Sequence, residues 1–199
     1  MKLYVTPGSP YARMARIVVI EKGLEARVEV ILAKTRTAGS AYYTINPSGR
    51  VPYLVRDDGS GLEESANICA WLDQIDGRPM FEPPGWEARR LEALARSLMD
   101  GLAVWLREGY RPPDERSPAV IEHEKARAQR MADLWEREIG NPLLHGRLNM
   151  IQLTLACALG IDARNPEFQW RPGRPRLAAW FDAFAARPSF LATAPPPGR

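Results

Sequence analysis

Hydrophobic positions in the first third of the chain follow two different periods. Short alternating runs predict strands, and apolar residues spaced three and four apart predict helices. The expected strands are Lys2 to Thr6, Arg27 to Leu32, Pro52 to Arg56, and a short one around Gly61 to Glu63. Expected helices are Tyr11 to Lys22, a weak one from Thr35 to Thr44, and one opening at Glu64 and Ser65. In the second strand, Val28, Val30 and Leu32 share one side, which is typical of a half-buried strand.

The pattern changes at Arg78 to Gly85, where three prolines and a glycine in eight residues exclude a helix or a central strand. Beyond this point only the helical period is present. Leucines at the spacing of one helix face run from Leu91 to Leu106, and Ser117-Pro118 is a typical helix start. Further helices are expected at Met150 to Leu159 and Pro175 to Ala186. We therefore predict an α/β domain over residues 1–77, a linker over 78–85 and an all-α domain over 86–199.

Charge and composition exclude several classes of protein. The 27 basic and 24 acidic side chains give a net charge of +3 and are interspersed, so we expect no nucleic-acid partner. The longest apolar run near the start is Ile17 to Ile20, too short for a signal peptide or a membrane span, so a cytoplasmic protein without a membrane partner is expected. Cys69, Cys157, His123 and His145 show no metal-ligand spacing, and neither a metal site nor a disulfide scaffold is predicted.

Three motifs stand in order within the predicted α/β domain: Ser9-Pro10-Tyr11-Ala12-Arg13, the segment from Asn46 to Leu54, and Glu64-Ser65-Ala66-Asn67-Ile68. Together with the helix at Asn149 to Ala158 and the segment from Trp180 to Leu191, they resemble the cytosolic glutathione transferases, with the serine-type turn of bacterial members. The resemblance implies an α/β thioredoxin-like N-terminal domain followed by an all-α C-terminal domain. It also implies a cis proline at Pro52, glutathione as co-substrate with no other cofactor, and a homodimer.

The resemblance places Ser9 at the first cysteine of the thioredoxin-type turn and makes it the group that activates the glutathione thiol. A free thiol has a pKa of about 8.5, and lowering it by about two units requires about 2.7 kcal/mol of preferential thiolate binding. One charge-assisted hydrogen bond supplies about 1.5 to 3 kcal/mol and a helix N-terminus about 0.3 to 1. Tyr11 is a second candidate. The alternative for Ser9 is an ordinary helix cap.

The other groups of the tripeptide need partners as well. Before a cis Pro52, the backbone of Val51 can pair with the peptide of the glutathione cysteine. The N-terminus of the helix at Ser65 suits the γ-glutamyl carboxylate, and Glu64 suits the α-ammonium group. Without the other motifs, Glu64 and Ser65 are an ordinary acidic helix start. Lys34 and Arg50 are the candidates for the glycine carboxylate.

A small hydrophobic electrophile is expected in an apolar pocket between the domains. Its candidate residues are Tyr11, Met14, Met99, Trp105 and Tyr110, although helical spacing favours core packing over a pocket role for Met99 and Trp105. Conjugation of glutathione to such an electrophile is the first function hypothesis. A glutathione-dependent peroxidase or reductase and a non-catalytic binding module are the alternatives; disulfide exchange is disfavoured because position 9 carries no sulfur.

Overall fold

A computed structural model describes residues 1–196 of the chain. These residues form two compact units, one made of Met1–Glu82 with Pro188–Pro196 and the other of residues 83–187. Within the described part of the chain, no helix is long and apolar enough to cross a membrane. The last three residues of the predicted all-α domain, 197–199, lie outside the described residues.

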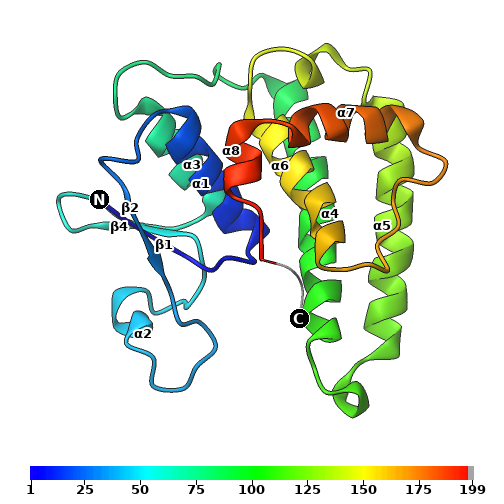
Figure 1. The fold of residues 1–199 in the computed structure, drawn as a ribbon, viewed down its shortest axis with the longest axis horizontal. Helices are drawn as coiled ribbons and strands as arrows, with labels where there is room; N and C mark the ends of the chain where they lie inside the picture. Colours follow the sequence, from blue (N-terminus) through cyan, green and yellow to red (C-terminus); the bar gives the residue numbers. More distant parts are fainter. Residues whose placement is uncertain (197–199) are drawn as a thin grey trace. The chain divides into compact units, whose positions relative to one another are not determined.

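The first unit is built on a four-stranded mixed sheet with strand order β2-β1-β3-β4. Strand β1 pairs in parallel with β2 and antiparallel with β3, and β3 pairs antiparallel with β4. The elements in chain order are β1 (Lys2–Val5), α1 (Pro10–Glu21), β2 (Glu29–Leu32), α2 (Tyr42–Ile45), β3 (Tyr53–Val55), β4 (Gly61–Leu62) and α3 (Ser65–Gln74). Figure 1 shows α1 and α3 side by side against the sheet, with α2 on its other side. This arrangement confirms the predicted thioredoxin-like fold.

The core of this unit lies between the central strands and the paired helices α1 and α3. Leu3 and Leu54, which face each other in the β1–β3 register, are fully buried, as is Ile17 on α1. The burial predicted for one side of the second expected strand holds for Val28, which is 2% exposed, but is wrong for Val30 and Leu32 of β2, which are 44% and 69% exposed. Strand β2 is the edge of the sheet and pairs only with β1, so these side chains lack neighbours on one flank. The predicted helix from Thr35 to Thr44 is reduced to the four residues of α2.

The end of the described chain belongs to the first unit. Helix α8 (Pro188–Ala192) packs on α1, where Ser189 Oγ donates to Glu21. The buried Arg13 guanidinium lies 3.5 Å from the Phe190 ring centroid, and its Nη2 donates to the Phe190 carbonyl at 2.8 Å. Residues 188–196 were predicted within the all-α domain, but these contacts group them with the first unit instead.

An ion-pair cluster fixes the segment that leaves α3. Lys22 at the end of α1 lies 3.7 Å from Asp73 and 2.9 Å from Asp76. Asp73 in turn accepts hydrogen bonds from the backbone N–H groups of Met80 and Phe81, at 2.7 and 3.0 Å. The prolines after α3 prevent helix formation in this segment. The Asp73 carboxylate therefore accepts the Met80 and Phe81 N–H groups in place of the backbone carbonyls of a helix.

The second unit is helical, as predicted. It contains α4 (Trp86–Gly109), η1 (Pro113–Glu115), α5 (Pro118–Glu138), η2 (Pro142–Leu144), α6 (Met150–Leu159), η3 (Gly160–Ala163) and α7 (Pro175–Ala185). Every residue from 151 to 159 of α6 is buried, and α4 packs along both α5 and α6 (Figure 1). At Gly101 of α4 a Cβ atom would lie 2.4 Å from Glu124 Oε2 on α5, so glycine permits this close approach.

Two helices of this unit begin with a side-chain cap, and the first of these confirms the predicted helix start at Ser117. Ser117 Oγ accepts the Val120 N–H at 3.4 Å, and Asn149 Oδ1 accepts the Gln152 N–H at 3.1 Å. The Gln152 side chain does not complete a reciprocal capping box, because its amide donates to the Leu143 carbonyl at 3.3 Å.

Candidate functional site

The register of the sheet brings the three sequence motifs to one end of the first unit. Tyr4 of β1 pairs with Tyr53 of antiparallel β3, so the segment that follows β1 and the segment that precedes β3 lie at the same sheet end. Leu62 of β4 pairs with Leu54, which directs the chain after β4 toward that end as well. Ser9, Val51, Glu64 and Ser65 therefore come from neighbouring segments; these four residues are called the strand-end site below. Lys34 follows parallel β2 and leaves the sheet at the same end.

Ser9 is the N-cap of α1, with extended backbone angles before Pro10 at the first helical position. Its Oγ accepts the Ala12 N–H at 3.2 Å, and its own N–H donates to the Thr6 carbonyl at 3.1 Å. A hydroxyl can accept two hydrogen bonds and donate one. Within the described part of the chain, the Ser9 O–H donates no hydrogen bond, so this proton is available to an acceptor in front of the helix.

The peptide bond between Val51 and Pro52 is cis, which confirms the prediction for Pro52. Pro52 is buried and Val51 is partly buried. Among residues 1–196, the N–H and C=O groups of Val51 have no hydrogen-bond partner, although they lie next to the start of β3. Unpaired backbone groups beside a strand are suited to pair with an extended peptide.

A hydrogen-bond network that the sequence did not predict holds the turn before Val51. Asn46 Nδ2 donates to the Arg50 carbonyl at 3.1 Å and to Glu63 Oε1 at 3.4 Å. Ser48 Oγ donates to the same Glu63 oxygen, and the Tyr42 hydroxyl donates to the Arg50 carbonyl. Burial raises the pKa of Tyr42, which favours the neutral phenol that this bond requires.

One part of this network had a local signal in the sequence. Asn46 Oδ1 accepts the Ser48 N–H at 3.1 Å, an Asx turn that an Asn-Pro-Ser-Gly cluster favours. Gly49 follows with a φ of +67°, and a Cβ atom there would lie 2.7 Å from Tyr43 Cε1. Glycine is therefore required at this position both by conformation and by space.

Glu64 and Ser65 form the entrance to α3. Glu64 has a φ of 71°, a region that non-glycine residues rarely adopt, and its exposed side chain makes no capping hydrogen bond. Ser65 is buried and begins the helix. The helix N-terminus supplies unpaired N–H groups and a partial positive charge beside an exposed carboxylate, which together suit a group that carries one negative and one positive charge.

Lys34 and Arg50 are exposed, and the structure leaves their predicted role as a proposal. The backbone of Arg50 is fixed by its carbonyl partners and by a bond from its N–H to Ser48 Oγ at 3.2 Å. Tyr11 is partly buried in the first turn of α1. Tyr11, Lys34 and Arg50 thus belong to the same unit as the strand-end site.

The residues predicted for the electrophile differ in exposure. Met14, Met99 and Trp105 are buried, and the Trp105 ring packs on Phe168 with centroids 6.3 Å apart. Tyr110, by contrast, is 48% exposed at the end of α4.

The cysteines and histidines lie outside the strand-end site. Cys69 and Cys157 are buried on α3 and α6, and neither forms a disulfide. His123 and His145 are exposed in the helical unit, where His145 Nε2 lies 2.6 Å from the Ile139 carbonyl oxygen. Among the described residues, no three His, Cys, Asp or Glu side chains lie close enough together to hold a metal ion.

Comparison with known proteins gives matches over both units. Residues 8–75 match the profile of the glutathione S-transferase N-terminal domain, and residues 118–183 match that of the glutathione S-transferase C-terminal domain. The uncharacterized GST-like protein YibF of Escherichia coli is 29% identical over 98% of this chain and 99% of its own length.

Solved structures agree with these matches. A glutathione transferase family member from Pseudomonas fluorescens, with bound S-(propanoic acid)-glutathione, is 31% identical, with a TM-score of 0.86 over 98% of this chain and all of its own. A second structure from the same organism, with bound glutathione, is 30% identical, with a TM-score of 0.87 over 98% of each chain. On these matches and on its two-unit fold, the chain belongs to the glutathione S-transferase family.

Proposed function

We propose that this protein binds glutathione at the strand-end site and activates its thiol for attack on a small electrophile. The observation that carries the proposal is Ser9, whose hydroxyl caps α1 and still has its proton available. A thiolate in front of this helix would accept the Ser9 O–H and the partial positive charge of the helix N-terminus together. The sum of the two interactions matches the roughly 2.7 kcal/mol that a drop of about two pKa units requires.

The remaining residues of the site are proposed to hold the tripeptide. The unpaired backbone groups of Val51 would pair with the cysteine peptide, and the start of α3 at Ser65 would bind the γ-glutamyl carboxylate. Glu64 would pair with the α-ammonium group, and Lys34 or Arg50 with the glycine carboxylate. That a relative with 30% identity is described with bound glutathione supports this assignment.

Tyr11 and Tyr110 are the proposed electrophile contacts, because both keep exposed surface. The other three residues predicted for this role, Met14, Met99 and Trp105, are buried. The homodimer that the family resemblance implies is part of the same proposal, and sedimentation velocity measures it directly.

The test is a titration of reduced glutathione followed by the ultraviolet absorbance of its thiolate near neutral pH. The wild-type protein should give a saturable thiolate signal with a depressed pKa. In Ser9→Ala the pKa should rise by about one to two units, as expected for loss of one charge-assisted hydrogen bond. Glutathione should still bind, since the other contacts remain.

Ser117→Ala is a matched control, because Ser117 is also an N-cap before a proline and accepts an N–H three residues on. Its loss should lower helix stability by about 1 kcal/mol without changing the thiolate signal. If Ser9→Ala and Ser117→Ala behaved alike in the titration, Ser9 would be only a helix cap. If the wild type bound no glutathione, the protein would be a binding module of another kind.

A further inference from the structure

Glu63 adjoins one part of the strand-end site and contacts the turn that leads into another. It directly follows β4 and precedes Glu64 at the entrance to α3. Its Oε1 accepts hydrogen bonds from Ser48 Oγ and, at 3.4 Å, from Asn46 Nδ2. The Glu63 carboxylate therefore connects the turn before Val51 to the start of α3.

Asn46 extends this restraint to the backbone of Arg50. Asn46 is 2% exposed, and its Oδ1 accepts the Ser48 N–H at 3.1 Å, so its Nδ2 is the group that remains to donate. That Nδ2 donates to the Arg50 carbonyl at 3.1 Å as well as to Glu63. The acceptor at Glu63 keeps the amide in this orientation, and the amide in turn holds the Arg50 carbonyl.

Tyr42 gives the same carbonyl a second buried donor. Its hydroxyl donates to the Arg50 carbonyl, and the residue is 5% exposed. The Tyr42 ring packs on Tyr4 of β1 with ring centroids 5.6 Å apart, which fixes α2 against the central strand. The Arg50 carbonyl thus points toward two buried side chains, those of Tyr42 and Asn46.

The direction of the Arg50 carbonyl determines the direction of the Val51 N–H. The two groups belong to one planar trans peptide, in which they point in opposite directions. Because the carbonyl is turned toward Tyr42 and Asn46, the Val51 N–H is turned away from them, and within residues 1–196 it has no partner. Rotation of this peptide would break the hydrogen bonds to the carbonyl and redirect the N–H.

We propose that Glu63 is a positioning residue that holds the Val51 N–H ready for the carbonyl of the glutathione cysteine. The inference rests on the proposed function and adds to it a residue that acts through its neighbours. A segment that is already ordered raises affinity, because the ligand does not have to order it on binding. Without the Glu63 carboxylate, the turn from Asn46 to Arg50 loses its connection to α3 and the contact of Val51 weakens.

Two ligands separate the Val51 contact from the rest of the site. They are glutathione and γ-glutamylcysteamine, which keeps the γ-glutamyl group and the thiol but lacks the cysteine carbonyl and the glycine. In isothermal titration calorimetry, Glu63→Ala should bind glutathione about three- to tenfold more weakly than the wild type, as expected for one hydrogen bond. Its affinity for γ-glutamylcysteamine should be unchanged, since that ligand lacks the carbonyl that the Val51 N–H is proposed to bind.

Glu63→Gln tests whether the hydrogen-bond acceptor is what matters. The amide oxygen of glutamine can accept the bonds from Ser48 and Asn46 that Glu63 Oε1 accepts. This variant should therefore bind both ligands with nearly the wild-type affinity.

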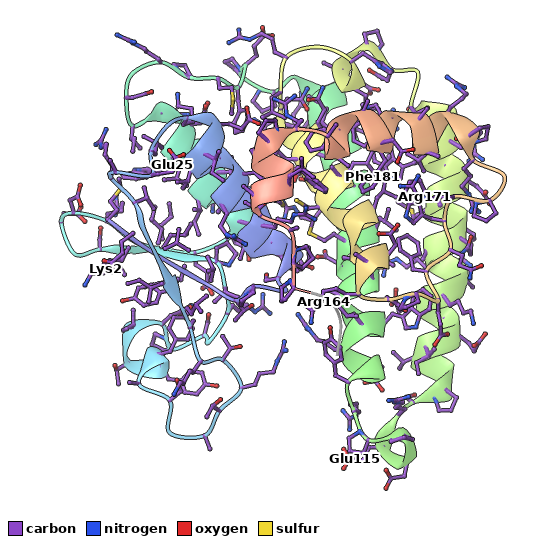
Figure 2. All side chains as sticks on the ribbon, in the orientation of Figure 1. Lys2, Glu25, Glu115, Arg164, Arg171 and Phe181 are labelled. Atoms are coloured by element: carbon purple, nitrogen blue, oxygen red, sulfur yellow. The ribbon has the colours of Figure 1, made fainter. Side chains whose placement is uncertain are left out.

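Asp58→Ala is the matched control, because the Asp58 carboxylate also holds a serine of a turn. It accepts the Ser60 N–H at 2.9 Å and the Ser60 hydroxyl. This turn follows Val55, which pairs with Lys2, so it lies at the sheet end that Lys2 marks in Figure 2, opposite the strand-end site. Asp58→Ala should leave the affinity for both ligands unchanged.

Three results would overturn the inference and leave the glutathione site intact. In the first, Glu63→Ala weakens both ligands by the same factor, so that Glu63 only supports the fold. In the second, Glu63→Ala binds glutathione as tightly as the wild type. In the third, Glu63→Gln is as weak as Glu63→Ala. If the wild type bound neither ligand, the proposed function itself would be overturned.

Discussion

At the scale of single residues, the candidate site is made of groups that secondary structure leaves unpaired. The Ser9 hydroxyl has an available proton, Val51 has a free backbone N–H and C=O, and α3 begins at Ser65 directly after the exposed side chain of Glu64. Each is fixed by neighbouring hydrogen bonds and is therefore preorganised for a ligand. Among these residues, Glu64 has the most unfavourable backbone conformation, with a φ of 71°.

The unusual backbone of Glu64 leads to a prediction that separates stability from binding. Glu64→Gly should increase the free energy of unfolding by about 0.5 to 1 kcal/mol, because glycine adopts a φ of 71° without strain. The same change should weaken glutathione binding about tenfold or more, since the carboxylate proposed to hold the ammonium group is lost. Urea unfolding and calorimetry measure the two effects.

Arg36→Gly serves as the comparison, because Arg36 is a second non-glycine residue with positive φ, at 54°. It should show the gain in stability without the loss of affinity. A loss of stability in Glu64→Gly would mean that the Glu64 side chain stabilises the fold and that its backbone is not strained.

At the scale of elements, helix packing depends on where small residues stand. Gly101→Ala should lower the free energy of unfolding by about 1 kcal/mol, because the added methyl meets the buried Glu124, which Arg127 holds in place. Gly109→Ala on the same helix has open space around it and should raise stability by up to about 1 kcal/mol. Thermal or urea unfolding distinguishes the two. A stabilised Gly101→Ala would show that α4 and α5 separate freely.

The end of α3 gives a pH prediction. The hydrogen bond from Lys22, together with that from the Arg78 N–H, lowers the pKa of Asp76 below its ordinary value. A lowered folded-state pKa stabilises the fold at every pH above the unfolded value of about 3.9, and this contribution is lost as the pH falls through the folded value. The free energy of unfolding, measured with urea at several pH values between about pH 5 and about pH 2, should therefore fall more steeply with decreasing pH for the wild type than for Asp76→Asn.

Asp114→Asn is the control for this measurement, because Asp114 is exposed in η1 and accepts no hydrogen bond within the described residues. Its pH dependence should match that of the wild type. If Asp76→Asn matched it too, the cluster around Lys22 would contribute nothing to acid stability.

Elements with local signals were predictable from the sequence, and elements that depend on distant partners were not. Ser117-Pro118 and Asn149 carry their caps in the sequence itself, and α5 and α6 begin where these residues indicate. The exposure of Val30 and Leu32 follows from the position of β2 at the sheet edge, which a period of two cannot reveal.

The site divides in the same way. Ser9 and Val51-Pro52 lie in short sequence motifs, so both could be singled out from the sequence. The cis peptide bond between Val51 and Pro52 confirms the prediction for Pro52. The contact of Glu63 with Asn46 and Ser48 depends on the register of β3 and β4, so the sequence pattern did not contain it.

At the scale of the whole molecule, the first unit is assembled from both ends of the described chain. Phe190→Ala should therefore destabilise this unit by about 3 kcal/mol, because the ring is 5% exposed and lies against the Arg13 guanidinium on α1. Leu191→Ala, one residue further, removes a side chain that is 62% exposed and should change stability by less than about 0.5 kcal/mol. Urea unfolding monitored by circular dichroism compares them, and equal losses would contradict the packing of α8 on α1.

The return of α8 to α1 also orders events during protein synthesis. The ribosome completes the four strands and α1 early, but the partners of Arg13 at Phe190 and Thr193 are added only after all of the helical unit has been made. In a nascent chain that ends before residue 188, the Arg13 guanidinium on α1 would lack the Phe190 carbonyl that accepts its hydrogen bond in the folded protein. The helix that carries the proposed thiol-activating residue thus acquires its full set of contacts only after the whole helical unit has been synthesised, and the proposed glutathione site would reach its final form only then.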